Sequence, residues 1–433
     1  MNFHAQTRWG QAGNFAEVTK RAGRQFTDEY PRVLVVTKQS VCPAHGIGAV
    51  LLRHFGGYDP SRLANVFISN DGAPPWAFSL QARRRSSQRW SQRWAERLAL
   101  RMTNQCARAV GLNAGMTGMA RYFRPVKPEL NAMKFHPDVI YSNCFCDDDL
   151  SLTWEISKEY NHAIPLVQHF HDYMPDEGGD CERILRKLLP RCDSVWVLGE
   201  GIGNELRTRF GCSAKIVNTF KVEVAPELPR VHRPVDKSFR AVMVGNVHYP
   251  PVLEDVRRLW RGVQARVPGL RPIEWVGSSR QVERCRESGV AFEPEVEFVG
   301  FKPDLQSYLA EADLAIIPFN CAASPENPYA RFSIPSRLTE MAATGMPIFC
   351  IAGPGTEARR FVETRRMGVC ANRSEGEQFH DKFLRILSSS NLRAQLGRQA
   401  RKVAETEFDL NDYQNQLYRR LCNLALRRES RHS

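Results

Sequence analysis

A carboxylate stands within an apolar stretch of this sequence. Residues 334–347 read IPSRLTEMAATGMP, and Glu340 lies there among leucine, methionine and alanine. Pro335 suits the first turn of a helix and Gly345 suits the left-handed residue that ends one, so the pattern predicts a helix over 335–344. A carboxylate near the start of an apolar helix needs hydrogen-bond donors or water. Glu340 is therefore either a ligand-binding group or a solvent-facing residue that the helix dipole favours.

A second polar cluster follows the apolar run IPLVQ. The segment HFHDYMPD places His169 and His171 two residues apart at the end of a predicted strand, so both side chains lie on one face. Asp172 follows directly. A histidine followed directly by an aspartate at a strand end, where ligands of parallel sheets bind, favours a functional role. His171 and Asp172 are therefore the candidate catalytic residues, and the alternative is a strand-end histidine with a structural role.

The run CFCDDDL, residues 144–150, combines side-chain types that bind metals. It lies outside the expected ligand pocket, so an aspartate-rich helix N-terminus or a solvated loop is the preferred interpretation. The twelve cysteines of the chain include no CxxC pair and no His/Cys cluster at zinc spacing. These observations predict reduced thiols and no metal site.

The elements that must position these residues are alternating strands and helices. In the first half, buried parallel strands are predicted over 32–38, 64–69, 137–143, 164–170, 194–199 and 215–220, with helices over 150–160, 180–190 and 200–210. A proline-rich linker follows at 224–238. In the second half, strands are predicted over 239–246, 273–278, 296–301, 314–319 and 346–353, with helices over 251–266, 303–312, 335–344, 356–366, 376–390 and about 393–428.

This alternation predicts an α/β protein with two doubly wound parallel-sheet domains. The expected parts are an N-terminal extension at 1–30, a first Rossmann-like domain at 31–225, a second at 238–400, and a C-terminal crossover helix with a basic tail at 401–433. Open parallel sheets bind ligands outside the carboxyl ends of their strands. The site is therefore expected in a cleft between the domains, and the last helix is long enough to return to the first domain.

The chain has 60 Lys and Arg residues against 47 Asp and Glu, a net charge of +13, which attracts polyanions without choosing among them. The stretch 83–108 holds eight arginines, and its Trp90, Trp94, Leu98 and Met102 form one helical stripe. Tryptophan beside arginine on a helix is typical of an interfacial membrane contact, and the alternative is a surface helix packed on the core. No nucleic-acid-binding signature accompanies the charge, so no nucleic acid partner is expected.

The sequence contains no run of about eighteen apolar residues, and its first thirty residues lack the apolar core of a secretory signal. A cytoplasmic protein is therefore expected, with stretch 83–108 as a candidate peripheral contact to the inner face of the cell membrane.

The second half resembles the donor-binding domain of GT-B glycosyltransferases, most of all the retaining family 4 (glycosyl transferases group 1). Four motifs carry the resemblance in order: AVMVGN, VEFVGFKPDLQSYLAEADLAIIPF, PSRLTEMAATGMPIFC and GTEARRFVETRRMGVCA. In the first half, PLVQHFHDYMPD, CDSVWVLGEGIGNELRTRFG and KIVNTF resemble the family's acceptor-domain segments. The resemblance covers about residues 31–405 and implies the GT-B fold.

The resemblance also implies a role for each candidate residue. Glu340 would accept hydrogen bonds from the donor ribose, His171 and Asp172 would lie near the donor sugar, and the backbone around Gly300 would contact the base. The implied donor-binding residues are Glu340, Arg337, Ser336, Gly245, Asn246, His248, Val299, Gly300 and Phe301. The glycine-containing loop after the first strand, with His45, Gly46 and Gly48, would present backbone N–H groups to the diphosphate and the acceptor.

Two positions depart from the family pattern. The family has a second glutamate eight residues before the one matched by Glu340, where it contacts the sugar, and this chain has Phe332 there. Many relatives also place arginine and lysine after the strand that Gly245 ends, and this chain offers Asn246 and His248. The candidates to stabilise a leaving diphosphate are then Arg337, Arg331 and the helix N-terminus, with His248 if it is protonated.

The resemblance implies a metal-independent, hexosyltransferase-like enzyme without a cofactor. It would move a sugar from a nucleoside diphosphate sugar to an acceptor hydroxyl, with retention of configuration. The basic stretch favours an acceptor glycan or lipid-linked sugar, as in the synthesis of cell-surface polysaccharide or glycolipid. Two alternatives stay open: a GT-B nucleotide-sugar epimerase, and a catalytically silent nucleotide-sugar-binding protein that would explain the missing glutamate.

Overall fold

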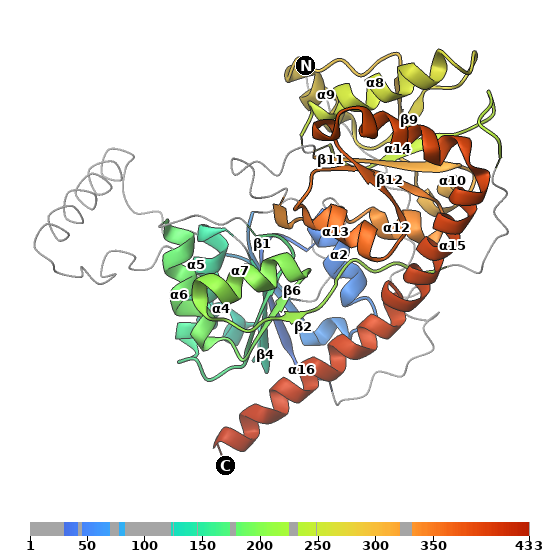
Figure 1. Ribbon diagram of the computed structural model, residues 1–433. Helices are drawn as coiled ribbons and strands as arrows, with labels where there is room; N and C mark the ends of the chain where they lie inside the picture. Colours follow the sequence, from blue (N-terminus) through green and yellow to red (C-terminus); the bar gives the residue numbers. More distant parts are fainter. Residues whose placement is uncertain are drawn as a thin grey trace, which may run out of the picture. The chain divides into compact units, whose positions relative to one another are not determined.

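The computed structural model describes residues 30–41, 46–69, 78–82, 123, 125–144, 146–173, 179–224, 233–247, 249–320 and 331–432. Figure 1 shows its helices and strands. The predicted basic helix at 83–108 lies outside these residues, as do His45 and His248.

The first sheet has seven strands in the order β3-β2-β1-β4-β5-β6-β7, and the neighbours pair in parallel. Its strands are β1 Val33–Gln39, β2 Leu63–Ser69, β3 Phe78–Gln81, β4 Val139–Asn143, β5 Leu166–Phe170, β6 Ser194–Val197 and β7 Lys215–Ile216. The helices of this half are α2 Gly46–His54, α4 Lys127–Ala132, α5 Asp147–Glu159, α6 Asp180–Leu188 and α7 Glu200–Phe210. Strands β4 and β5 are buried at every residue, as expected for parallel strands covered on both faces.

The second sheet has six strands in the order β10-β9-β8-β11-β12-β13, again parallel. Its strands are β8 Ala241–Val244, β9 Ile273–Val276, β10 Val296–Gly300, β11 Leu314–Asn320, β12 Ile348–Ala352 and β13 Gly368–Ala371. The helices of this half are α8 Val252–Gln264, α9 Ser279–Glu287, α10 Leu305–Ala310, α12 Leu338–Ala343, α13 Glu357–Thr364, α14 Glu377–Ser388, α15 Ser390–Glu407 and α16 Leu410–His432. One hydrophobic core joins this sheet to α8, α9 and α14, with Trp260 and Trp275 fully buried in it.

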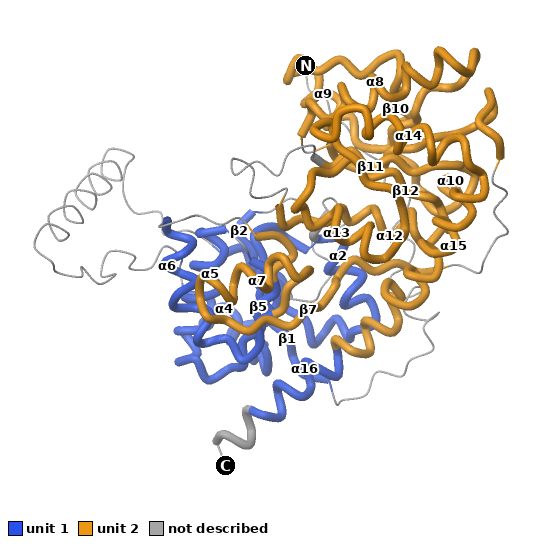
Figure 2. The backbone as a smooth tube through the Cα atoms, viewed as in Figure 1, with its two compact units in different colours: residues 1–169, 176–195, 418–433 blue, residues 170–175, 196–417 orange. Residues whose placement is uncertain are grey.

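The chain forms two compact units, coloured in Figure 2. Unit 1 contains residues 1–169, 176–195 and 418–433, and unit 2 contains residues 170–175 and 196–417. The division falls within the first sheet, because unit 2 includes Phe170 of β5, the residues of β6 from Trp196 onward, and β7.

The predicted fold class of two parallel α/β sheets is confirmed. Several elements differ from their predicted form. Strands β3 and β13 and helices α2, α4 and α9 were not predicted, and the predicted strand over 215–220 is reduced to the two residues of β7. The acidic run after β4 occupies the first turn of α5, where the Asp149 carboxylate accepts a hydrogen bond from the Cys146 N–H at 2.7 Å. This confirms the helix N-terminus interpretation of that run.

The predicted single last helix is wrong, because α15 and α16 are separate helices. Phe408 is the C-cap of α15, and its carbonyl accepts a hydrogen bond from the Val222 N–H at 2.9 Å instead of from a residue further along a helix. The Asp409 carboxylate then accepts from the Asp412 N–H at 2.7 Å, as an N-cap of a new helix does. The start of α16 belongs to unit 2 and its residues from Tyr418 belong to unit 1, so the helix does return to the first half as predicted.

Candidate functional site

Three adjacent strands of the second sheet end in glycine. Gly245 follows β8, Gly277 follows β9 and Gly300 ends β10, and each glycine comes directly after a valine. Gly245 and Gly300 have positive φ angles of 92° and 75°, which other residues rarely adopt. Because parallel strands end at one edge of a sheet, these glycines line the edge where ligands of such folds bind.

Short contacts hold this glycine edge together. The Gly245 N–H donates to the Val276 carbonyl at 2.9 Å, and the Trp275 indole donates to the Gly245 carbonyl at 3.0 Å. A Cβ atom on Gly277 would lie 3.4 Å from that same carbonyl oxygen. These glycines add no side chain of their own to the edge, which favours a close approach of a ligand to their backbone.

Arg337, the residue directly before α12, connects this helix to the glycine edge. A Cβ atom on Gly245 would lie 3.2 Å from Arg337 Cγ, so the arginine stem passes over the glycine. The Arg337 guanidinium forms an ion pair with Glu340, with 3.0 Å between Nη1 and Oε1. Gly245, Arg337 and Glu340, which the sequence proposed as one site, therefore lie in a continuous line of contacts.

Glu340 is buried, with 5% of its surface exposed. Its second oxygen, Oε2, accepts a hydrogen bond from the Thr339 hydroxyl at 3.1 Å. The interpretation of Glu340 as a solvent-facing residue is wrong, because the carboxylate is enclosed and held by named donors. Each carboxylate oxygen can accept a second hydrogen bond.

Helix α12 is shorter than predicted, because Pro335 and Ser336 precede it and Arg337 is its N-cap. The helix ends as predicted before Gly345, whose φ angle is 65°. Two N–H groups at its start are engaged locally, since Leu338 donates to the Pro335 carbonyl and Thr339 to the Ser336 carbonyl. The diphosphate contact at this N-terminus stays a prediction. Ser336 is exposed beside it.

The remaining donor candidates surround the same edge. Phe301 follows Gly300 and keeps 59% of its surface exposed, which is unusual for a large apolar side chain. Val299 is half-buried and Asn246, after Gly245, is exposed.

Asp172 contacts the segment that precedes α12. The Ser333 hydroxyl donates to Asp172 Oδ1 at 2.8 Å, and both residues belong to unit 2. Burial raises the pKa of the Asp172 carboxyl to about 6, although the Ser333 hydrogen bond opposes the rise. His171, beside it, is buried, while His169 belongs to unit 1, where its Nδ1 lies 2.7 Å from the Tyr141 hydroxyl.

Phe332 occupies the position of the missing glutamate and is a core residue, with 2% of its surface exposed. Its ring centroid lies 5.6 Å from that of Tyr173, and the Arg331 guanidinium lies 4.9 Å from it. A Cβ atom on Gly201 would lie 3.3 Å from Phe332 Cδ1. The ring is therefore packed between the Tyr173 ring, the Arg331 guanidinium and the backbone of Gly201.

A second carboxylate, Glu357 of α13, was not among the predicted site residues. Its Oε2 accepts a hydrogen bond from the Gly201 N–H at 3.1 Å, in the first turn of α7, and the Arg360 guanidinium donates to both of its oxygens. The other Arg360 nitrogen, Nη1, lies 2.7 Å from Glu200 Oε2. The pair GxG in VLGEGIGN is the signal in the sequence, because Gly199 and Gly201 leave the space that the carboxylate fills.

The predicted glycine loop after β1 is in part a helix. Gly46 is the first residue of α2 and Gly48 lies in its first turn, where Gly48 is buried. The prediction that both glycines belong to an open loop is therefore wrong.

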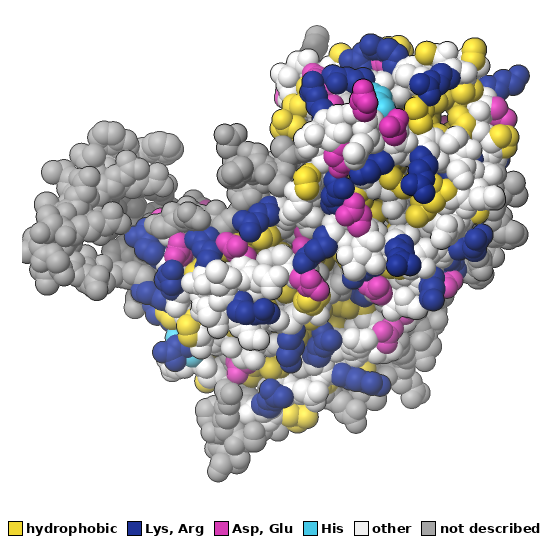
Figure 3. Space-filling view, in the orientation of Figure 1, with side chains coloured by type: hydrophobic (Ala, Val, Ile, Leu, Met, Phe, Trp, Pro, Cys, Tyr) yellow, Lys and Arg dark blue, Asp and Glu magenta, His cyan; other side chains and the backbone are white. Residues whose placement is uncertain are grey.

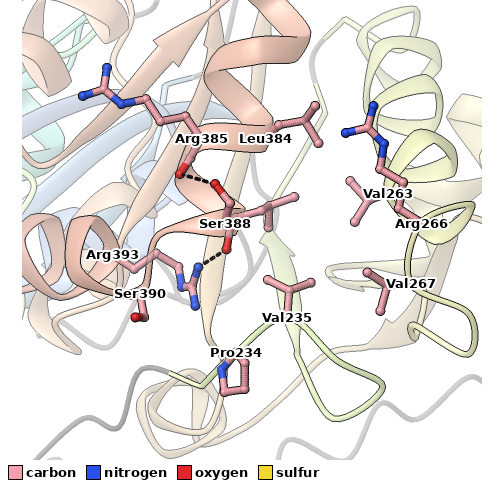
Figure 4. A pocket seen from close by; sticks show the side chains of 11 residues that line it. Pro234, Val235, Val263, Arg266, Val267, Leu384, Arg385, Ser388, Ser390 and Arg393 are labelled. Carbon is pink, nitrogen blue, oxygen red and sulfur yellow. Dashed lines mark hydrogen bonds between the residues drawn. The ribbon is translucent and has the colours of Figure 1, made fainter.

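A pocket of about 660 Å³ lies elsewhere in unit 2, between α8, the start of α15 and the end of α14 (Figure 4). Val235, Val263 and Val267 form its apolar wall, and Arg393 closes one side by donating to the carbonyls of the last turn of α14. None of the predicted site residues lines it.

Within the described ranges, no group of three or more His, Cys, Asp and Glu side chains is arranged to hold a metal ion. Among the same residues no helix is both long and apolar enough to cross a membrane. On the face seen in Figure 3, Lys and Arg side chains are interspersed with Asp and Glu rather than gathered into one patch.

Comparison with known proteins agrees with this architecture. Residues 222–389 match the family model described as Glycosyl transferases group 1. HepE from Anabaena, solved with UDP-glucose, is 17% identical and has a TM-score of 0.59; the match covers 91% of this chain and 100% of HepE. WaaG, a glycosyltransferase involved in lipopolysaccharide biosynthesis, is 14% identical with a TM-score of 0.55; the match covers 89% of this chain and 98% of WaaG.

A glycosyltransferase from Rickettsia africae is 12% identical with a TM-score of 0.55, and the match covers 92% of this chain and 99% of that one. No curated protein sequence matches this chain. Residues 222–389 are thus similar to the family described as Glycosyl transferases group 1, and the two parallel sheets give the chain the GT-B fold.

Proposed function

We propose that this protein is a glycosyltransferase that moves a sugar from a nucleoside diphosphate sugar to an acceptor hydroxyl. The observation that carries the proposal is the buried Glu340 carboxylate, held by Arg337 and Thr339 beside the glycine edge. A carboxylate with two adjacent acceptor oxygens suits a ribose diol, whose two hydroxyls need two adjacent acceptors.

Arg337 would connect the ribose to the diphosphate. In the structure its guanidinium pairs with Glu340 Oε1, while 39% of its side chain remains exposed. A ribose hydroxyl that donates to Oε1 would replace the guanidinium at that oxygen. The guanidinium, which lies one helical turn before Glu340, would then be available to the diphosphate. A cation fixed at that place would stabilise the charge that develops as the glycosidic bond breaks.

The edge formed by Gly245 and Gly300 would bring the backbone against the nucleotide, and the exposed Phe301 ring would stack on its base. HepE was solved with UDP and with UDP-glucose, which supports a UDP-sugar as the donor class. The retaining outcome, the absence of a metal or cofactor requirement, and an acceptor glycan or lipid-linked sugar at the membrane remain parts of this proposal.

Nucleotide binding by variants of Glu340 tests the proposal. We expect Glu340→Gln to weaken UDP binding about 10- to 100-fold in calorimetry, because hydrogen bonds to a charged group contribute about 1.5–3 kcal/mol. The same variant should also release less UDP from a UDP-sugar in the presence of acceptor glycans. Glu377→Gln, an exposed glutamate in the first turn of α14, is the matched control and should bind like the unsubstituted protein.

Unchanged UDP affinity in Glu340→Gln would contradict the assignment of Glu340. Failure of the unsubstituted protein to bind any nucleoside diphosphate or its sugar would contradict the function.

A catalytically silent binding protein is the second candidate, and Phe332 favours it. The ring fills the place of a sugar-binding carboxylate and is fixed by Tyr173. A silent binding protein would bind a UDP-sugar but would release no UDP from it in the presence of any acceptor. Formation of an epimer from the UDP-sugar alone would instead identify an epimerase on the same fold.

A further inference from the structure

The pocket between α8, α14 and α15 combines an apolar wall with positive charge. Eleven residues line it, all of them described by the structure, and three of these are arginines while none is an aspartate or glutamate. Val235, Val267 and Leu384 are half-buried and pack against the hydrophobic core of unit 2. Part of their apolar surface therefore stays open in the pocket, where an aliphatic chain could cover it favourably.

Arg393 of α15 places a buried cation at this pocket, with 1% of its surface exposed. Its Nη1 donates to the Ile386 carbonyl at 3.0 Å and to the Leu387 carbonyl, and its Nη2 donates to the Arg233 carbonyl. Its Nε has no hydrogen-bond partner among the described residues. The guanidinium is thus fixed by backbone carbonyls, and these do not balance its charge.

The wider surroundings of Arg393 leave that charge poorly balanced. The Phe239 ring, 5.3 Å from the guanidinium carbon, is neutral. The Asp313 carboxylate acts on Arg393, but it also accepts from the Arg240 N–H at 2.8 Å and pairs with Arg233 at 3.6 Å. Burial lowers the pKa of the Arg393 guanidinium, so the cation is held at a free-energy cost. An anion in the pocket would offset that cost.

Arg266, just after α8, lies across the pocket from Arg393 (Figure 4). Its side chain is exposed, so it can turn toward a ligand. The guanidinium of the third arginine, Arg385, points away from the cavity in the same view. An inorganic anion would leave the apolar wall in water, and an uncharged chain would leave Arg393 unbalanced. An aliphatic chain that ends in a carboxylate satisfies both parts of the pocket.

We propose that this pocket binds a fatty acid, with its chain against the valine and leucine side chains and its carboxylate near Arg266 and Arg393. The inference goes beyond the proposed function and does not rest on it, because none of the candidate donor-binding residues lines the pocket. Unit 2 would then hold two separate ligand sites.

Binding of decanoate, measured by calorimetry below its micellar concentration, tests the proposal. We expect decanoate to bind at one site per chain. Acetate, which lacks the chain, should not bind. Decyltrimethylammonium has the same chain and the opposite charge, and it should bind at least about tenfold more weakly than decanoate.

Two variants locate the site. Val235→Trp would fill the pocket with an indole ring and should abolish decanoate binding. Arg266→Glu reverses an exposed charge without disturbing the core, and it should weaken decanoate binding about tenfold. Arg258→Glu, the same change at an exposed position of α8 outside the pocket lining, is the matched control and should bind decanoate like the unsubstituted protein.

Circular dichroism shows which variants are folded. Absence of decanoate binding by the unsubstituted protein would overturn the proposal, and so would equal affinity for decanoate and decyltrimethylammonium. Unchanged decanoate affinity in Arg266→Glu, or in folded Val235→Trp, would also overturn it.

Discussion

Asp172 and Glu340 are two carboxylates in different surroundings. Glu340 has a guanidinium at 3.0 Å and a hydroxyl at 3.1 Å, whereas among the described residues Asp172 accepts from one neutral side chain, Ser333. A charge that is removed from water without a cationic partner is held at a free-energy cost. A site residue with this cost is typical where function rather than stability requires the group.

The raised pKa of Asp172 leads to a prediction for stability. The carboxyl has a pKa near 4 when unfolded and about 6 when folded, so the folded state binds its proton more tightly. Its contribution to the free energy of unfolding therefore falls as pH rises from about 4 to 6 and is constant above that range. We expect Asp172→Asn to raise the thermal midpoint at pH 7.5 relative to the unsubstituted protein, and to change it little at pH 4.

The difference in free energy of unfolding between Asp172→Asn and the unsubstituted protein should grow by about 1–3 kcal/mol from pH 4 to pH 7.5. The segment that holds Ser333 carries the charged residues Arg331 and Arg337, and the segment of Asp172 carries the titratable residues His171 and Tyr173. A difference that stays constant from pH 4 to 7.5 would contradict the raised pKa.

At the scale of elements, the N-terminus of α7 and the start of α13 depend on each other. The Glu357 carboxylate accepts from the Gly201 N–H and is held from the other side by Arg360. A helix N-terminus has free N–H groups and a positive dipole end, and a carboxylate from another helix satisfies both. The contact joins residues 156 positions apart.

Gly201→Ala should break this contact. The new Cβ atom would lie 2.7 Å from Glu357 Oε2, and the carboxylate cannot move away without losing Arg360 or the helix N–H. We expect a loss of about 1–3 kcal/mol in the free energy of unfolding, measured by chemical denaturation.

Gly262→Ala in α8 is the matched control. Its new Cβ atom would meet nothing within 4 Å, so the helix should gain about 0.5–1 kcal/mol. If Gly201→Ala proved as stable as Gly262→Ala, the Glu357 contact would have no energetic role.

At the scale of the whole molecule, α16 links the two units of the chain. Its Tyr418 hydroxyl donates to the His54 carbonyl at 3.1 Å and accepts from the Gly57 N–H at 3.3 Å. The Tyr418 ring also lies 5.0 Å from that of Tyr58, and all four residues belong to unit 1. The helix is therefore fastened to unit 1 after it leaves unit 2.

Tyr418→Phe should loosen this attachment while keeping the ring. Two buried backbone groups of unit 1 would lose a partner, which costs about 1–3 kcal/mol. We expect trypsin to cleave α16 faster in limited proteolysis, and the thermal midpoint to fall. Tyr249→Phe, at an exposed tyrosine, is the control and should behave like the unsubstituted protein. Equal cleavage rates in the two variants would contradict the attachment.

The alternation of strands and helices was readable from the sequence, because buried parallel strands and amphipathic helices have distinct local patterns. The limits 31–225 and 238–400 for the two domains stay predictions. Helix ends were less readable: α12 begins at Leu338 rather than at the proline, and the N-cap at Asp409 that separates α15 from α16 was overlooked. A valine-glycine pair marks each of three strand ends in the sequence. Gly245 and Gly300 are among the predicted site residues, and Gly277 is not.

The sequence by itself determined the α/β class, the glycine at the end of α12 and the unusual carboxylate Glu340, because each depends on residues close together in the chain. Only the tertiary structure decided that Glu340 is enclosed, that Ser333 holds Asp172, and that Glu357 lies at the start of α7. The last two contacts join residues more than 150 positions apart, where local propensity has no influence. They exist because packed sheets bring distant loops to the same place. Gly199 and Gly201 mark an open space at the start of α7, but no local pattern identifies the distant side chain that fills it.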